Sequence, residues 1–148
     1  MNTTAVWTEK QVFRVDFPGG EAFTLASVPR DAHPAPGPSP MEAVQAALAC
    51  CSGIDVVSIL EKMRQSLAAL RIEVEAMRRE EVPRVYTQLT LVYHVDGPDL
   101  DAASVVRAVA LSQDKYCSVA AMLRPAVAMG CRIILNGTVI PSGTAIPE

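Results

Sequence analysis

The stretch SPMEAVQAALACCSGIDVVSIL, residues 39–60, decides the fold. Of the 18 residues from Ala43 to Leu60, 13 are apolar, and they lie all around a helix. Such a helix either crosses a membrane or forms the centre of a core. Asp55 argues against a span, because an ionised aspartate at mid-bilayer costs about 3 kcal/mol. We therefore expect a central helix, running to about Gln65, that is wrapped by a sheet and buried on more sides than one small sheet covers.

The start of this helix carries a clear signal. Ser39 is a good N-cap, Pro40 suits the first helical position, and Glu42 follows Ser39 by three residues, which predicts a capping box. Gly53 costs about 1 kcal/mol inside a helix relative to alanine, so we expect either a packing reason for it or a local break. A break directly after Cys51 would leave free amide donors that stabilise a thiolate.

The segments on either side of the helix predict an α+β fold. Five prolines make residues 28–40 a loop. Alternating apolar residues predict a hairpin over 11–27, two long strands within 70–97 and a last strand within 129–140. A helix over 99–116, capped by Asp99 or Asp101, precedes a short helix over 117–123 capped by Ser118. The order ββ-α-ββ-α-α-β indicates an antiparallel sheet in a single domain over 1–148.

Composition narrows the possible partners. The net charge of −3, with 20% charged residues, gives no reason to expect nucleic acid as a partner. The chain is 50% hydrophobic with a mean hydropathy of +0.23, which is apolar for a lone soluble domain and favours an oligomer. The start MNTTAVWTEK does not resemble a signal peptide, so we expect a cytoplasmic protein with no membrane partner.

The spacing of the four cysteines does not indicate a metal site or a disulfide scaffold. Cys50 and Cys51 are adjacent and point to different sides of a helix, and no C-x-x-C or H-x3-H spacing occurs, so we expect no metal. Cys117 stands immediately before a helix start, where the partial positive charge lowers a thiol pKa. Cys131 lies in the last predicted strand, which indicates core packing.

No hydrolase or nucleotide-binding motif is present either. His33 lies in the proline-rich loop and His94 on a predicted strand, and neither accompanies a nucleophile motif. The chain has no glycine-rich phosphate loop. The cysteines are therefore the residues from which chemistry is expected.

Two cysteine motifs carry a family resemblance. GPSPMEAVQAALACCSGIDVVSILEKMR, residues 37–64, resembles the OsmC/Ohr family, in the OsmC-like branch with a P-M-E start and a C-x-G-x-D-V core. DKYCSVAAML, residues 114–123, resembles the second cysteine motif of the family. The order of elements agrees over essentially the whole chain. The resemblance implies an intertwined homodimer in which strands of both subunits form sheets around central helices.

The resemblance also implies an activity and its residues. It implies a thiol peroxidase that reduces organic hydroperoxides in oxidative-stress defence, with a dithiol reductant and no cofactor. The first motif cysteine, which attacks the peroxide, maps onto Cys51, and the second, which resolves the sulfenic acid into a disulfide, maps onto Cys117. Cys50 is then expected to be helix packing.

Peroxidases of the family also use a glutamate and an arginine around the thiolate. The usual glutamate position, ten residues before Cys51, is Met41 here, and Glu42 stands next to it. Arg30 is the first candidate for the arginine and Arg14 the second. A non-catalytic thiol protein of the same fold, which senses redox state or binds a small molecule, is the alternative.

Overall fold

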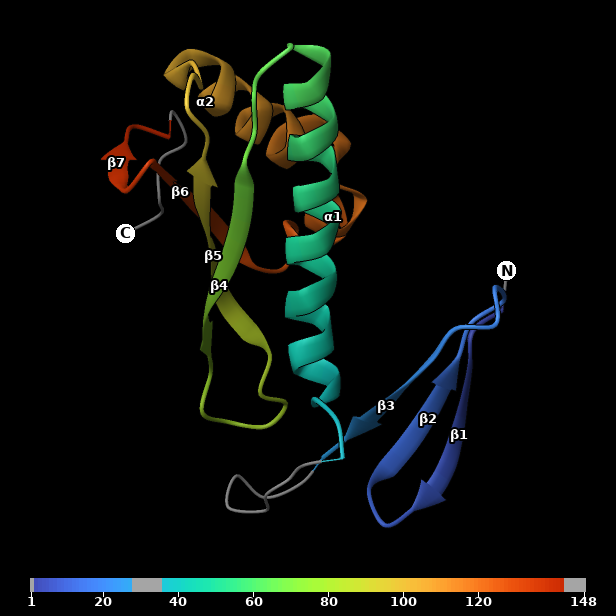
Figure 1. Cartoon of the computed structure of the whole chain (residues 1–148). Helices are drawn as coiled ribbons and strands as arrows, with labels where there is room; N and C mark the ends of the chain where they lie inside the picture. The colour runs from blue at the N-terminus through green and yellow to red at the C-terminus, as the bar shows by residue number, and fades with distance from the viewer. Residues whose placement is uncertain (1, 28–35, 143–148) are drawn as a thin grey trace. The chain divides into compact units, whose positions relative to one another are not determined.

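The computed structural model describes residues 2–27 and 36–142, so Arg30 and His33 lie outside the described residues. The chain forms two compact units, Met1–Ala46 and Ala47–Glu148, and each is considered by itself (Figure 1). The single domain expected over 1–148 stays a prediction.

The N-terminal unit contains a three-stranded antiparallel sheet in the order β1-β2-β3. β2 (Val12–Asp16) and β3 (Ala22–Ala26) form the expected hairpin. β1 (Thr4–Glu9) pairs with β2 and was not expected. All six residues of β1 are exposed in this chain, so no buried face imposes the apolar alternation by which a strand is detected.

The long helix α1 (Pro40–Lys62) starts with the expected capping box. The Ser39 amide donates to the Glu42 carboxylate at 2.7 Å, and the Glu42 amide donates to the Ser39 hydroxyl at 3.2 Å. The helix ends three residues before the expected Gln65. Arg64 adopts a left-handed backbone with φ of 57°, and the Gln65 amide donates to the Leu60 carbonyl at 2.9 Å, which closes the last turn.

The C-terminal unit is built on a four-stranded sheet in the order β4-β5-β6-β7 (Figure 1). Its strands are β4 (Ala69–Arg78), β5 (Tyr86–Asp96), β6 (Ala128–Leu135) and β7 (Thr138–Ile140). The α+β class is confirmed, with two differences in the sheet. β5 and β6 are parallel, and the single strand expected within 129–140 is two antiparallel strands, β6 and β7. The segment between them, α2 (Ala102–Leu111), η1 (Ser112–Tyr116) and α3 (Ser118–Leu123), is a crossover that returns the chain in the same direction.

α1 packs against the face of this sheet that carries Ile72 and Tyr93, which are cross-strand partners on β4 and β5. A Cβ placed on Gly53 would lie 3.2 Å from the Ile72 Cδ1 atom, and the Ser52 hydroxyl lies 2.6 Å from the Tyr93 hydroxyl. The helix runs unbroken through Gly53, so the local break was a wrong expectation and close packing explains the glycine.

The buried side of α1 is one stripe. Its fully buried residues recur every four positions, at Leu48, Ser52, Val56 and Leu60. The opposite side includes Ile54, which is 70% exposed, so burial on all sides is not achieved within one chain. α1 is long and apolar enough to cross a membrane, a test that core helices of soluble proteins also pass. The stripe completes a core with these residues of β5 and α2: Leu89, Leu91, Tyr93, Val95, Val105, Ala108 and Val109.

Candidate active site: a cysteine pair beside an aspartate

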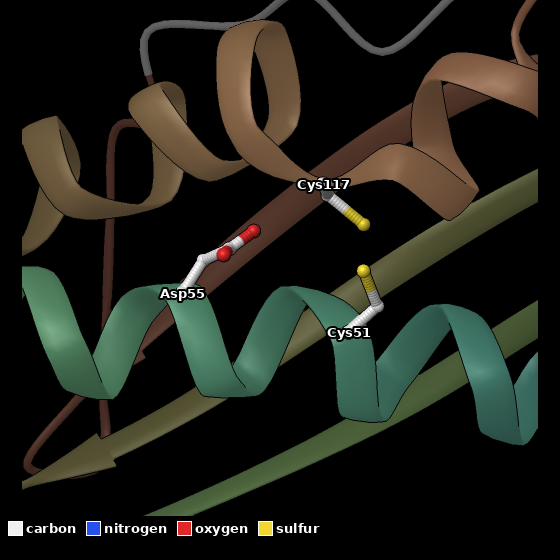
Figure 2. A group of neighbouring side chains, drawn as sticks. All are labelled: Cys51, Asp55 and Cys117. Carbon is white, nitrogen blue, oxygen red and sulfur yellow. The ribbon is translucent and has the colours of Figure 1, made fainter.

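Cys51 and Cys117 face each other in the C-terminal unit. The two Sγ atoms and a carboxylate oxygen of Asp55 all lie within 4.8 Å of one another. Cys51 and Asp55 lie four residues apart on α1 and therefore on the same face, one turn apart. Figure 2 shows the two sulfurs pointing toward one another across the gap between α1 and the turn at Cys117. Both thiols are free, and a modest side-chain movement would bring them to bonding distance.

The turn between η1 and α3 places Cys117. Its backbone is extended, with φ of −68° and ψ of 101°, and its amide donates to the Ser112 carbonyl at 2.9 Å. Its Sγ atom accepts a hydrogen bond from the Ala120 amide at 3.4 Å, so Cys117 itself is the N-cap of α3. The expected cap, Ser118, is the first helical residue instead.

Cys117 is held as a neutral thiol. Burial, with 2% of the residue exposed, raises its pKa from 9.0 to about 11. The Ala120 amide opposes this shift, while the Cys51 thiol and the charge of Asp55 add to it. The expectation that a helix start would lower the pKa of Cys117 is therefore wrong, because desolvation outweighs one amide donor from a six-residue helix.

A buried hydrogen-bond network leads to Asp55. Gln113 donates its amide nitrogen to the Tyr93 oxygen at 2.5 Å and to the Ser52 hydroxyl at 3.2 Å. Ser52 lies 2.6 Å from the Tyr93 oxygen and 2.8 Å from the Ser112 hydroxyl. The Ser112 hydroxyl reaches the Asp55 carboxylate at 3.2 Å. Because a carboxylate only accepts, the hydroxyl protons are directed along the chain toward Asp55.

This network joins three elements at the cysteine pair. Ser52 adjoins Cys51 on α1, Tyr93 lies on β5, and η1 supplies Ser112 and Gln113. Burial raises the pKa of Tyr93 far above its ordinary value, so its phenol stays neutral and keeps its proton for donation. Asp55 is thus a hydrogen-bond acceptor at the end of this network.

Ser112 and Gln113 were not predicted as residues of the site. Residues 99–116 were expected to form one α-helix, whereas the last five form the π-helix η1, a form that occurs often at functional sites. The available signal was the pair of polar residues at the end of an apolar helix. Nothing local could have said that these residues meet Ser52. The predicted cap Asp101 is observed, with its carboxylate accepting from the Ser104 amide at 2.8 Å.

The glutamate and arginine that the family resemblance implies stay predictions. Glu42 belongs to the N-terminal unit and is engaged with Ser39 in the capping box. Arg14 belongs to the same unit and pairs with Asp16 at 2.8 Å. Arg30 lies outside the described residues. Among residues 2–27 and 36–142, no hydrogen bond or ion pair joins an arginine to either cysteine of the pair.

The other two cysteines differ from each other. Cys131 on β6 is 1% exposed, which confirms it as a core residue. Cys50 is exposed and lines an open groove on α1, so it does not pack within the chain as expected.

The α+β fold thus joins two cysteines that are distant in sequence beside a buried polar network. The family model described as OsmC-like protein matches residues 32–132, and the chain belongs to this family, as its two motifs indicated. The family includes organic hydroperoxide resistance proteins.

Three relatives illustrate the similarity. Protein YhfA of Escherichia coli strain K12 is 42% identical over 127 residues, which cover 86% of this chain and 92% of YhfA. The structure of an OsmC-like protein from Mycoplasma pneumoniae superposes with a TM-score of 0.79 at 16% identity and covers 90% of this chain and 95% of that one. The structure of organic hydroperoxide resistance protein OhrB of Bacillus subtilis superposes with a TM-score of 0.66 at 15% identity. The match covers 90% of this chain and 98% of OhrB. At these identities the two structures show a shared fold.

Proposed function

We propose that this protein is a cytoplasmic thiol peroxidase that reduces small organic hydroperoxides, with Cys51 as the attacking and Cys117 as the resolving cysteine. The observation that carries the proposal is the meeting of two sulfurs that are 66 residues apart in sequence, with their Sγ atoms within 4.8 Å. Membership of a family that includes organic hydroperoxide resistance proteins supports the choice of substrate class.

The proposed reaction has three balanced steps. The Cys51 thiolate attacks the O–O bond of ROOH, and with one proton from solvent this gives Cys51 sulfenic acid and the alcohol ROH. The Cys117 thiol then attacks the sulfenic sulfur, and the hydroxyl leaves with the thiol proton as water, which forms the disulfide. A dithiol reductant exchanges with this disulfide and restores both thiols. The departing hydroxyl accepts the Cys117 proton as the S–S bond forms, so the raised pKa of Cys117 slows this step without blocking it.

The burial of the two cysteines supports this division of roles. Cys51 is half-buried, whereas Cys117 is 2% exposed. A peroxide that enters from solvent therefore meets Cys51 more readily than Cys117. We assign no part in the chemistry to Glu42, which is engaged in the capping box. Arg30, which the family resemblance implies, stays the candidate for the arginine beside the thiolate.

Turnover of cumene hydroperoxide with dithiothreitol tests the proposal. We expect Cys51→Ser to reduce turnover by at least 100-fold, because a hydroxyl is not ionised at neutral pH and attacks the O–O bond poorly. Cys50→Ser is the matched control, since it makes the same exchange one residue away on an exposed side, and we expect it to keep the wild-type rate. Equal turnover in Cys51→Ser and wild type would refute the assignment of Cys51 as the attacking cysteine.

Peptide mapping after one equivalent of hydroperoxide, in the presence of a chelator, separates the roles of the two cysteines. We expect a single Cys51–Cys117 disulfide with Cys131 free. In Cys117→Ser, the Cys51 sulfenic acid has no partner and should proceed to sulfinic acid with excess peroxide. A disulfide that includes Cys50 would contradict the two-cysteine mechanism.

A redox-sensing thiol protein is the second candidate. Two observations favour it: Glu42 is engaged in the helix cap, and Cys117 keeps its proton over the physiological pH range. A sensor would form the same disulfide once but would not turn over with dithiol. The ratio of peroxide consumed to protein present, one for a sensor and many for a peroxidase, distinguishes the two.

We also propose that the working form is a homodimer, as is typical of the family. An open groove of about 650 Å³ lies along α1 and β4, and its apolar lining includes Ile54, Val57, Leu70 and Ile72. Within one chain, α1 is buried along a single stripe. We propose that a second copy of the chain covers the remaining apolar side.

Light scattering at micromolar concentration tests the homodimer. We expect a dimer mass for the wild type and a monomer mass for Ile54→Asp, because a carboxylate would be buried in the interface. Met122→Asp is the control, since Met122 is equally exposed at 71% but lies on α3. A wild-type mass near that of the 15.8 kDa chain would refute the dimer.

A further inference from the structure

We propose that the reduced site binds a soft divalent cation of the zinc class through the Cys51 and Cys117 sulfurs and the Asp55 carboxylate, so that metal binding and disulfide formation exclude each other. The inference goes beyond the proposed peroxidase, because it requires the three side chains and no peroxide chemistry. No metal was expected because the cysteines lack a local ligand spacing, whereas the fold joins ligands from α1 and from the η1–α3 turn.

The distances fit such a cation. Zinc binds cysteine sulfur at about 2.3 Å and carboxylate oxygen at about 2.0–2.2 Å, which places two sulfurs of a tetrahedral site about 3.8 Å apart. The three ligand atoms already lie within 4.8 Å of one another, so side-chain rotations of about 1 Å complete the geometry. Three protein ligands leave the fourth position to water, as in zinc sites that are open to solvent.

Two of the ligands already carry the hydrogen bonds that orient a metal site. The Ala120 amide donates to the Cys117 sulfur at 3.4 Å, and the Ser112 hydroxyl donates to the Asp55 carboxylate at 3.2 Å. Such outer donors hold ligands in place, and their loss typically costs about 10–100-fold in metal affinity. Ser112 is itself fully buried within the hydroxyl network, so the carboxylate is held by a rigid neighbour.

The charge around the cluster also favours a cation. The Asp55 carboxylate is one of the three ligands and places a negative charge beside the two sulfurs. A pocket of about 340 Å³ is lined in part by Cys117. Arg124, which lines this pocket, is occupied by the Asp114 carboxylate at 3.2 Å and the Gln113 carbonyl at 2.6 Å. A divalent cation would supply the positive charge that Arg124 does not bring to the sulfurs.

The binding step is balanced and reversible. The cation forms two metal–sulfur bonds and one metal–oxygen bond, and each thiol that carries a proton releases it to solvent. A Cys51–Cys117 disulfide has no thiolate to offer, so oxidation removes the site. The reduced protein is therefore the metal-binding form.

Cobalt titration of the full-length reduced protein tests the proposal, with Co²⁺ as a spectroscopic substitute for Zn²⁺. We expect a sulfur-to-cobalt charge-transfer band that Zn²⁺ abolishes by displacement. Asp55→Asn should weaken cobalt binding at least tenfold, and Cys117→Ser should remove most of the band. Cys50→Ser, one residue from the site, should bind as the wild type does. Protein oxidised to the disulfide should show no band.

Alkylation with mass-spectrometric readout gives an independent measurement. Zn²⁺ should slow the labelling of Cys51 and Cys117 at least tenfold and leave the labelling of exposed Cys50 unchanged. No band in the reduced wild type would overturn the proposal, and so would a band that survives in Cys117→Ser or disappears in Cys50→Ser. The peroxidase assays are run with chelator and the metal titrations without peroxide, so failure of either leaves the other standing.

Discussion

Ser112→Ala removes the hydroxyl that connects the buried network to Asp55. Ser112 is fully buried and its hydroxyl lies 2.8 Å from that of Ser52 and 3.2 Å from the Asp55 carboxylate. A hydrogen bond to a charged group contributes about 1.5–3 kcal/mol, and a buried donor left without its partner costs about 1 kcal/mol or more. Asp55 is only half-buried, so solvent replaces part of the first contribution. We expect a loss of about 2–3 kcal/mol in the free energy of unfolding.

The assay is urea denaturation of the reduced protein, with thermal unfolding in parallel. For a chain of this length the expected loss lowers Tm by about 5–10 °C. Ser118→Ala is the matched control: the same exchange at an exposed position six residues away should change the free energy of unfolding by no more than about 0.5 kcal/mol. This control also tests the cap of α3, because a large effect at Ser118 would contradict Cys117 as the capping residue.

A double-mutant cycle with Asp55→Ala measures the coupling directly. If the Ser112 hydroxyl acts on Asp55, the two losses should be non-additive by about 1 kcal/mol or more. The reasoning fails if Ser112→Ala costs as little as Ser118→Ala, or if the two losses simply add. In either case the network would be a local packing feature without influence on the site.

Two further predictions concern Cys117 and Gly53. The free energy of unfolding should fall between pH 9 and pH 11 by about 2–3 kcal/mol on account of Cys117. Its pKa is raised from 9.0 to about 11 in the folded state, so the unfolded chain releases the proton first and gains stability as pH rises. Denaturation across this range should show a smaller decline in Cys117→Ala, and an identical decline would refute the assignment. Gly53→Ala should raise the free energy of unfolding by up to about 1 kcal/mol, because helix propensity improves and the neighbouring atom is the movable Cδ1 end of half-buried Ile72. Lower thermal stability in this variant would mean that the Ile72 side chain cannot move away from the added methyl group.

Much of the fold could be predicted from sequence because it depends on interactions between residues that are close along the chain. Ser39, Pro40 and Glu42 predicted the start of α1 because a capping box is satisfied within four residues. Strand β4 was predicted correctly because only one of its faces meets a core, so half-buried and exposed residues alternate along it. Strand β5 was predicted from its apolar residues, although the structure buries both of its faces. The strand β1 escaped detection because none of its residues is buried in this chain.

The features that sequence could not predict are those that depend on contacts between distant segments of the chain. The cysteine pair was nominated only through resemblance to a family, since the two residues stand 66 positions apart and no local pattern says that they meet. The pKa of Cys117 was predicted in the wrong direction because a helix start is visible in sequence and the depth of burial is not.

The sequence by itself determined most of the elements, their order and the residues able to carry out thiol chemistry. Only the tertiary structure decided which of those residues share one site. Cys51, Asp55 and Cys117 lie together because η1 makes a π-turn whose Ser112 and Gln113 hydrogen-bond to Ser52 on α1. Hydrogen bonds and burial act over a few ångströms in space, whatever the separation along the chain. The neutral thiol at Cys117 and the carboxylate held beside it are therefore properties of the packed molecule.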